Sequence, residues 1–230
     1  MNVGFLLFPG IQPLDLIGPF DVLAGLPEVS LCLLAPELEP VQASRGLWLR
    51  PDTLFGACPA LDVLCVPGGA GIEAVMADDR YLEFIRAQAP GLRYLSSVCT
   101  GALALGAAGL LRGRRVTTHW AYQHLLVAFG AVAVEQRVVR DAELITGGGV
   151  TAGIDFALVL VAELFGTERA QRLQLALEYA PAPPFASGHP AEAPPAIVQL
   201  QRAAVQGAVD QRAAAVARAA ARVGQRAQPC

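Results

Sequence analysis

A cysteine stands where an apolar, strand-like run of the sequence changes into a helix-like one. The run Leu92–Val98 is followed by Cys99, by the pair Thr100-Gly101 and by the segment "LALGAAGLL". A strand-to-helix junction presents a side chain at the carboxyl edge of a sheet, and the N–H groups that begin a helix lower a thiol pKa. The pattern favours a nucleophilic Cys99. The alternative is a small buried residue, which most free cysteines are.

A carboxylic acid near the N-terminus is the second candidate for chemistry. Asp15 lies between Leu14 and Leu16 in "QPLDLIGPF". A carboxylate among apolar residues is costly unless it is paired or protonated, so the position suits an acid of raised pKa. The same Asp would also serve as an ordinary charge in the first turn of a helix, and the sequence leaves both interpretations open.

Two glycine-rich turns offer backbone N–H groups to an anion. "PGG" at 67–69 follows an apolar run, and "GGG" at 147–149 precedes a helix-like segment. The first turn lacks the Lys-Ser/Thr of a phosphate loop and the full dinucleotide pattern, which argues against a nucleotide site. Amides freed by glycines could instead stabilise a developing negative charge.

The histidines give no metal pattern. His119 and His124 are five residues apart, the wrong spacing for one helical face, and His189 lies in a proline-rich stretch. We predict no metal site. A Cys-His hydrolase would need one of these histidines beside Cys99, which the sequence cannot establish. The other cysteines are expected in two apolar strands, in a loop and at the C-terminus: Cys32, Cys65, Cys58 and Cys230.

The elements that must position these residues alternate along the chain. We predict strands over Val3–Phe8, Val29–Leu34, Asp62–Val66, Leu92–Val98 and Val116–Thr118, a hairpin over Leu47–Leu54, and two or three short strands in 132–149. We predict helices over Leu14–Ala24 (kinked or split at Pro19), 79–89, Thr100–Leu111, Trp120–Phe129, Thr151–Phe165 and Glu168–Tyr179. This alternation is typical of an α/β fold with a mostly parallel sheet and helices on both faces.

Length and composition fit one catalytic domain with a helical tail. The chain has 230 residues, of which 54% are hydrophobic, enough for a single large core over residues 1–195. Prolines make Ala180–Pro195 a loop, and Ala196–Arg226 is helical by propensity. We expect a C-terminal helical extension over 196–230, packed on the domain or on a partner subunit.

The net charge and the cysteines limit the kinds of partner and the cellular compartment that we expect for this protein. The net charge is −3 without a basic patch, so a nucleic-acid partner is not expected. We read the uncharged stretch Tyr94–Leu111 as a strand and a buried helix, not as a membrane span. The first residues lack a basic region and a cleavage site, and no C-x-x-C pair occurs, so we expect a cytoplasmic protein with free thiols.

Four segments resemble the ThiJ/PfpI branch of the class I glutamine amidotransferase-like superfamily. They are "FLLFPGIQPLDLIGPFDVL", "LDVLCVPGGAG", "YLSSVCTGALALGAAGLLRGRRVTTHWAY" and "VVRDAELITGGGVTAGIDFALVLVAELFG". The resemblance covers most of residues 3–179. It implies a flavodoxin-like sandwich, a homodimer, a cysteine on a nucleophile elbow, and a carboxylic acid from the first loop hydrogen-bonded to its sulfur. Many members have Glu there, and this chain has Asp15.

Within that branch the chain most resembles the isocyanide hydratases. The shared features include the Asp of the first loop, the Thr after the cysteine, "GGGVTAGIDFAL" and "LQLALEYAPAPPF". The resemblance implies addition of water to an isocyanide through a covalent thioimidate, without a cofactor. It implies the following site residues: Cys99, Asp15 and Thr100 as catalytic groups, and Gly69, Ala70, Gly148 and Val150 around the substrate.

Two other functions of the superfamily are the alternatives. Sensor modules of AraC-type regulators carry very similar "VCTGA…TTHW" text, but they append a helix-turn-helix domain, and the residues after Tyr179 lack turn-broken helices of that kind. The other alternative is a glyoxalase-like or deglycase-like enzyme, but the protease and deglycase members of the superfamily typically keep the Glu. Many proteases of the superfamily place a His directly after the cysteine, where this chain has Thr100.

Overall fold

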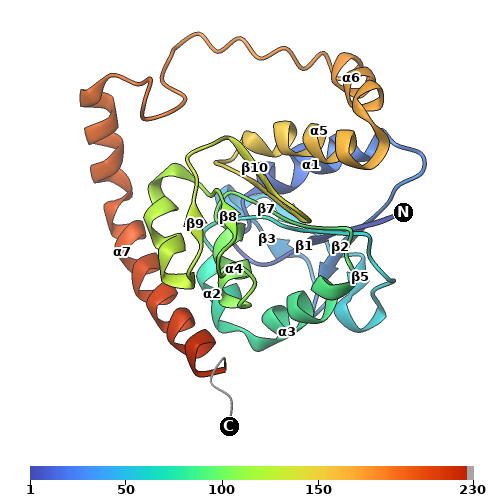
Figure 1. Cartoon of the computed structure of the whole chain (residues 1–230), viewed down its shortest axis with the longest axis horizontal. Helices are drawn as coiled ribbons and strands as arrows, with labels where there is room; N and C mark the ends of the chain where they lie inside the picture. Colours follow the sequence, from blue (N-terminus) through green and yellow to red (C-terminus); the bar gives the residue numbers. More distant parts are fainter. Residues whose placement is uncertain (227–230) are drawn as a thin grey trace.

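A seven-stranded sheet runs through the computed structural model, which describes residues 1–226 and so leaves Cys230 outside the described part (Figure 1). The strand order is β10-β11-β7-β6-β1-β2-β5. All neighbours are parallel except β10 and β11. The strands are β1 (Asn2–Leu6), β2 (Ser30–Ala35), β5 (Thr53–Leu54), β6 (Val63–Val66), β7 (Tyr94–Val98), β10 (Val138–Asp141) and β11 (Leu144–Gly147).

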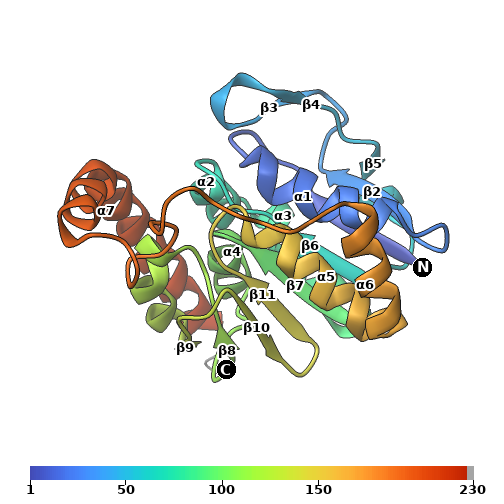
Figure 2. The same ribbon diagram turned by 90° about the horizontal axis from the view of Figure 1, so that it is seen from above.

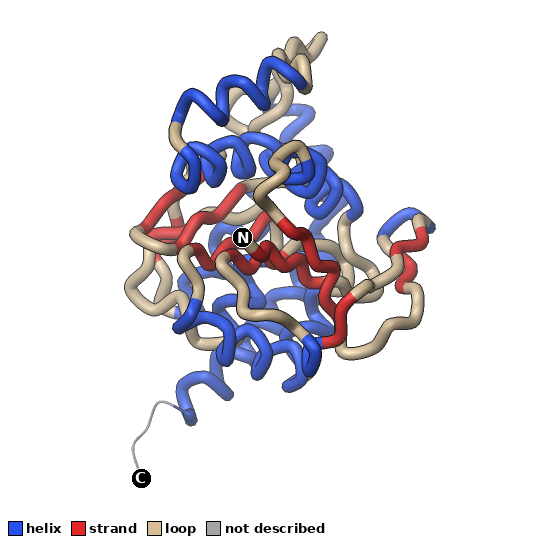
Figure 3. Tube along the Cα trace, turned by 90° about the vertical axis from the view of Figure 1, so that its right-hand side faces the viewer, coloured by secondary structure: helices blue, strands red, loops and turns tan. Residues whose placement is uncertain are grey.

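Helices cover both faces of this sheet, as the sequence predicts (Figures 1 and 3). One layer holds α1 (Pro13–Ala24), α5 (Ala152–Phe165) and α6 (Thr167–Ala176), and the other holds α2 (Ile72–Ala77), α3 (Asp79–Gln88) and α4 (Gly101–Ala107). Strands enclosed on both sides must be apolar throughout, and every residue of β6 is buried. The uncharged stretch Tyr94–Leu111 divides between β7 and α4, as predicted, and no helix within residues 1–226 is long and apolar enough to cross a membrane.

Helix α1 shows how packing overrides a helix breaker. Pro19 lies inside α1, yet the helix continues to Ala24, so a split at Pro19 is wrong. The proline ring lies against Gly153 of α5, where an added Cβ would be only 3.0 Å from its Cδ. Contact between the two helices therefore stabilises α1 despite the backbone hydrogen bond that proline cannot donate.

The predicted hairpin over Leu47–Leu54 is wrong. Instead, β3 (Val41–Gln42) pairs with β4 (Trp48–Leu49) in an arm that stands out from the body (Figure 2), and Thr53 of β5 pairs with Leu34 in the main sheet. A second small sheet joins β8 (Arg115–Val116) to β9 (Val132–Ala133). Residues 1–226 also contain four 3₁₀ segments: η1 (Ser44–Gly46), η2 (Phe55–Ala57), η3 (Ala89–Gly91) and η4 (Trp120–Phe129). Segment η4 is thus 3₁₀ where a helix is predicted.

The C-terminal extension is a single helix, α7 (Pro195–Arg226), reached by a loop that crosses above the α5–α6 layer (Figure 1). It lies along η4, α2 and α4 of the same chain. Its inward residues are few: Arg212, Ala215, Val216 and Ala219 are buried. The division of the chain into a domain of residues 1–195 and an extension stays a prediction.

Candidate active site

Four connections meet at the carboxyl ends of neighbouring parallel strands. Asp15 follows β1 at the start of α1, Gly68 and Gly69 follow β6, Cys99 follows β7, and Gly148 follows β11. Because β1, β6, β7 and β11 are adjacent in the sheet, their carboxyl ends lie at one edge. Such an edge is where open α/β sheets place their sites.

The backbone of Cys99 is held in an uncommon conformation. Its φ is 55°, in the left-handed region that residues with a side chain rarely adopt. Its N–H donates to the carbonyls of Gly147 at 3.0 Å and Gly148 at 2.9 Å, and its own carbonyl accepts from the Thr118 hydroxyl at 2.7 Å. Gly101 must be glycine, because a Cβ there would be 1.9 Å from the Val66 oxygen. These contacts maintain a strained turn that presents the sulfur at the site.

The Asp15 carboxyl is fully buried beside that sulfur. Its Oδ2 accepts from the Gly68 N–H at 3.0 Å, whereas Oδ1 has no hydrogen-bond partner that satisfies it. Burial raises the pKa of Asp15 to about 7, against the opposing effects of the Gly68 N–H and of the Cys99 thiol. Asp15 can therefore hold a proton near neutral pH, which an exposed Asp cannot.

Burial also raises the pKa of the Cys99 thiol, and the negative charge of Asp15 adds to that effect. The N–H groups of Val150 and Thr100 lower it but are outweighed. The N–H groups at the helix start thus act in the predicted direction, but the net pKa of this thiol is raised, so the expectation of a lowered pKa is wrong. Each of the two side chains shifts the pKa of the other, so the pair titrates as a unit and a proton can pass from the sulfur to the carboxyl within it.

Thr100 and Gly69 are joined to each other. The Gly69 N–H donates to the Thr100 hydroxyl at 3.0 Å, so it is not free for an anion as the sequence suggests. Gly69 has φ 141°, and a Cβ there would be 2.4 Å from the Gly10 oxygen. The structure thus brings together Cys99, Asp15, Thr100, Gly69, Gly148 and Val150. Ala70 is exposed, and among the described residues no hydrogen bond links it to Cys99 or Asp15.

His119 also borders the site, a placement that the sequence could not establish. A Cβ on Gly149 would be 2.7 Å from the His119 ring, so the imidazole lies against the glycine loop beside Val150. Its Nδ1 accepts from the Ala121 N–H at 3.3 Å. Burial first, and then the charge of Arg212, lower the pKa of His119 to about 4, so the ring is neutral at physiological pH. Across residues 1–226, no three His, Cys, Asp or Glu side chains gather as a metal site requires.

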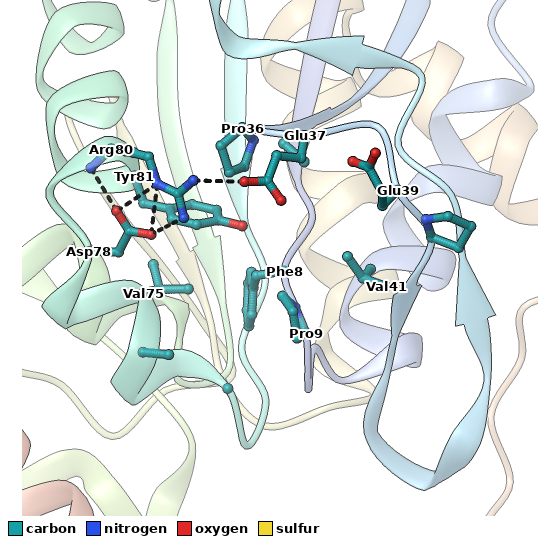
Figure 4. Close-up of a pocket in the computed structure, with 14 residues that line it drawn as sticks. Phe8, Pro9, Pro36, Glu37, Glu39, Val41, Val75, Asp78, Arg80 and Tyr81 are labelled. Atoms are coloured by element: carbon teal, nitrogen blue, oxygen red, sulfur yellow. Dashed lines mark hydrogen bonds and ion pairs between the residues drawn. The ribbon is translucent and has the colours of Figure 1, made fainter.

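A pocket of about 360 Å³ lies elsewhere, between β2, α2 and α3. Figure 4 shows Arg80 on its wall between Asp78 at 2.7 Å and Glu37 at 3.0 Å, with Phe8 and Tyr81 beneath. Neither Cys99, Asp15 nor Thr100 lines it. This pocket is therefore separate from the acid–thiol pair.

The fold and the cysteine turn define a class: the chain belongs to the DJ-1/PfpI family, whose sequence model matches residues 1–163. It is 56% identical to the isonitrile hydratase of Pseudomonas putida over 226 residues, which cover 98% of this chain and 99% of that protein. These findings confirm the predicted resemblance to the ThiJ/PfpI branch. The full-length similarity to a hydratase also confirms that the chain is an enzyme.

Two further comparisons bear on the fold and on the alternatives. A ThiJ/PfpI family protein from Pseudomonas syringae superimposes with a TM-score of 0.89 and 40% identity, over 95% of this chain and 90% of that one. An HTH-type transcriptional regulator of Pseudomonas aeruginosa is 33% identical over 175 residues, which cover 73% of this chain but only 47% of the regulator. The likeness to regulators is thus limited to about half of their length.

Proposed function

We propose that this chain hydrates isocyanides, R–N≡C, to N-substituted formamides through a covalent thioimidate on Cys99. The observation that carries the proposal is the buried pair of Asp15 and Cys99, in which the carboxyl has a pKa of about 7. The 56% identity to an isonitrile hydratase over nearly all of both chains supports the substrate class. Water is the second substrate, and the reaction is redox-neutral and calls for no cofactor.

In the first step the terminal carbon of the isocyanide accepts a nucleophile and a proton. The Cys99 thiolate forms the S–C bond while the Asp15 carboxylic acid gives its proton to the same carbon. The thiolate arises by transfer of the shared proton to Asp15, and the N–H groups of Val150 and Thr100 stabilise it. The products are a thioimidate, R–N=CH–S–Cys99, and an Asp15 carboxylate.

In the second step water adds to the thioimidate carbon. The Asp15 carboxylate takes one proton from the water and passes it to the nitrogen as the C=N bond becomes single. It then takes the hydroxyl proton as the C=O bond forms and the Cys99 thiolate leaves. The formamide R–NH–CHO is released, and the pair returns to its starting protonation.

The other site residues bind and orient. Thr100 holds the sulfur through its N–H and the Gly69 amide through its hydroxyl. Val150 supplies the second N–H to the sulfur, and Gly148 holds the Cys99 turn through its carbonyl. Gly69 serves as the partner of Thr100 and borders the substrate. Ala70, which is exposed, has the weakest support as a substrate contact.

The test supplies para-nitrophenyl isocyanide and methylglyoxal in parallel to the native protein and to Cys99→Ala. The proposal predicts Cys99-dependent formamide from the first compound and no lactate above background from the second. Lactate without formamide would assign a glyoxalase-like activity to the same nucleophile. If neither compound is turned over, a sensor role would be favoured, like that of the module in the HTH-type regulator, 47% of whose length matches this chain.

We further propose a cytoplasmic homodimer in which the loop Pro181–Pro195 and the C-terminal extension contact the partner. Large apolar side chains support this arrangement, because Leu175, Phe185 and Leu200 are 82%, 75% and 68% exposed in the single chain. The described cysteines, Cys32, Cys58, Cys65 and Cys99, are all free thiols, as a reducing compartment would keep them.

A further inference from the structure

Arg212, on the inner side of α7, reaches the glycine loop of the active site. The residue is only 5% exposed, and its guanidinium donates to the carbonyl of Gly69 at 3.4 Å. Its Cζ lies 4.3 Å from the centre of the Tyr122 ring. Its Nε is 3.5 Å from the Glu73 carboxylate and makes no hydrogen bond. The guanidinium is therefore buried with incomplete pairing.

A buried arginine that is incompletely paired lowers the stability of the folded protein. A buried charge needs a close ion pair and a partner for each donor, and Arg212 has neither in full. The other inward residues of α7 are apolar, namely Ala215, Val216 and Ala219. An apolar side chain at 212 would avoid the cost of burying a charge. The reason for an arginine here must lie in what it contacts.

The contact is with the loop that holds the acid and the threonine. The Gly68 N–H donates to Asp15, the Gly69 N–H donates to Thr100, and the carbonyl of Gly69 accepts from Arg212. Two glycines in succession give this loop more conformational freedom than any other residue pair would. Correct aim of both N–H groups therefore depends on contacts outside the loop.

We propose that Arg212 is a positioning residue of the active site, which keeps the N–H groups of Gly68 and Gly69 aimed at Asp15 and Thr100 by holding the Gly69 carbonyl. The helix α7 is then a functional part of the site and not only an extension. The effect on turnover rests on the proposed function. The effect on the acid–thiol pair does not, so the two can be tested apart.

The matched comparison is between two arginines of α7. Arg222 also donates to a backbone carbonyl, that of Met76 in α2, away from the acid–thiol pair. Arg212→Met and Arg222→Met each remove one such bond from the same helix, and Arg212→Lys keeps the charge and one donor. The readouts are kcat and KM with para-nitrophenyl isocyanide, thermal unfolding, and the rate of Cys99 alkylation by iodoacetamide against pH.

For Arg212→Met we expect kcat to fall about tenfold or more with little change in KM, because displaced catalytic groups slow the chemistry more than binding. The alkylation rate of the native protein should rise through an inflection near the Asp15 pKa of about 7. The Gly68 hydrogen bond lowers that pKa, so its loss should move the inflection to higher pH. The kcat and the inflection pH of Arg212→Lys should lie between those of Arg212→Met and the native protein. Both values for Arg222→Met should match those of the native protein.

Loss of the Arg212 charge should also raise the pKa of His119, which that charge lowers. This is measurable by NMR without any substrate. The groups that face Arg212 are Glu73 from α2, His119 immediately before η4, and Tyr122 within η4. If Arg212→Met and Arg222→Met leave kcat and the alkylation inflection equally unchanged, Arg212 is only a packing residue and the inference is wrong. Should Arg212→Met fail to fold, Arg212→Lys decides through the same readouts.

A native protein without isocyanide turnover would refute the proposed function alone. The alkylation profiles would still decide the role of Arg212, because they follow the acid–thiol pair directly. An upward shift confined to the Arg212 variants would support the positioning role in that case too.

Discussion

At Asp15, burial and hydrogen bonding act in opposite directions, and burial has the larger effect on the pKa. The Oδ1 atom accepts no hydrogen bond, which leaves the charged form of the carboxyl incompletely stabilised. A group with a pKa of about 7 can give a proton in one step and take one in the next at neutral pH. That dual use distinguishes Asp15 from the exposed Asp21 on the same helix.

Replacing Asp15 with Asn should leave the fold intact and remove most turnover. The amide keeps the shape and the hydrogen bond from Gly68, but it can neither protonate the isocyanide carbon nor activate water. General acid–base catalysis contributes roughly 10²–10⁴-fold, so kcat/KM should fall within that range. Asp21→Asn is the control and should keep full activity. A loss smaller than tenfold would take proton transfer away from Asp15.

The same substitution should change stability in a pH-dependent way. The carboxyl has a pKa of about 7 in the folded protein and 3.8 as the reference value, so between these pH values the folded state holds a proton that the unfolded chain releases. Native stability therefore falls as pH rises through this window, by at most about 4 kcal/mol. Asn carries no such penalty. The advantage of Asp15→Asn in the free energy of unfolding should grow from about pH 4 and level off above about pH 7. Urea unfolding at several pH values measures it, and a pH-independent difference would contradict the raised pKa.

At the scale of the elements, the site depends on how closely the β6 and β7 turns approach each other. A Cβ on Gly68 would lie 2.5 Å from both the N and the hydroxyl oxygen of Thr100, and 3.0 Å from Asp15 Oδ2. The N atom of Thr100 belongs to the backbone, so it cannot rotate away as a side chain could. The two turns can therefore meet only if residue 68 is glycine.

Gly68→Ala should separate these turns and reduce kcat/KM by about 10²-fold or more, the typical effect of a displacement of about 1 Å. The matched control is Gly56→Ala, because a Cβ on Gly56 meets nothing within 4 Å. Steady-state kinetics on both variants measures the effect. Equal activity of the two variants would mean that the approach of the turns does not matter for catalysis.

Much of this architecture could be predicted because its signals are local. The apolar run that ends at Cys99, the "PGG" turn and the alternation of strands with helices are all visible within short windows. The pairing of Thr53 with Leu34 could not be predicted in this way. The alternation of apolar and polar residues in 47–54 indicates strands but not which strand each one pairs with. Burial is equally invisible, which is why the helix start suggests a lowered pKa at Cys99 where the folded chain raises it.

The burial of Arg212 cannot be predicted from the sequence for a related reason. The tail is rich in Ala and Arg, and nothing in its sequence separates the one buried arginine from its exposed neighbours. Only the packing of α7 on η4 and α2 turns residue 212 inward. His119 likewise depends on the position of η4 against the "GGG" turn. Both residues are placed by contacts between segments far apart in the sequence.

For the whole molecule, the apolar side chains around the 181–195 loop predict self-association. Phe185 is 75% exposed, and a surface of such residues is typical of an interface. Light scattering should give twice the chain mass of 24.1 kDa for the native protein. Phe185→Asp should weaken the dimer, whereas Val132→Asp, an exposed apolar position outside the predicted interface, should not. A native protein that remains monomeric at high concentration would contradict the homodimer.

The proposed mechanism requires that Cys99 forms a covalent bond to the isocyanide carbon during turnover. Attack adds the whole substrate and water later removes it as formamide, so rapid-quench mass spectrometry of the native protein with para-nitrophenyl isocyanide tests the claim directly. We predict a transient species with the mass of the protein plus one intact isocyanide, mapped to Cys99, which forms and decays fast enough to account for turnover. Cys99→Ala should form neither the adduct nor the formamide. Formamide production by Cys99→Ala at the native rate, without an adduct on the native protein, would rule out the covalent thioimidate.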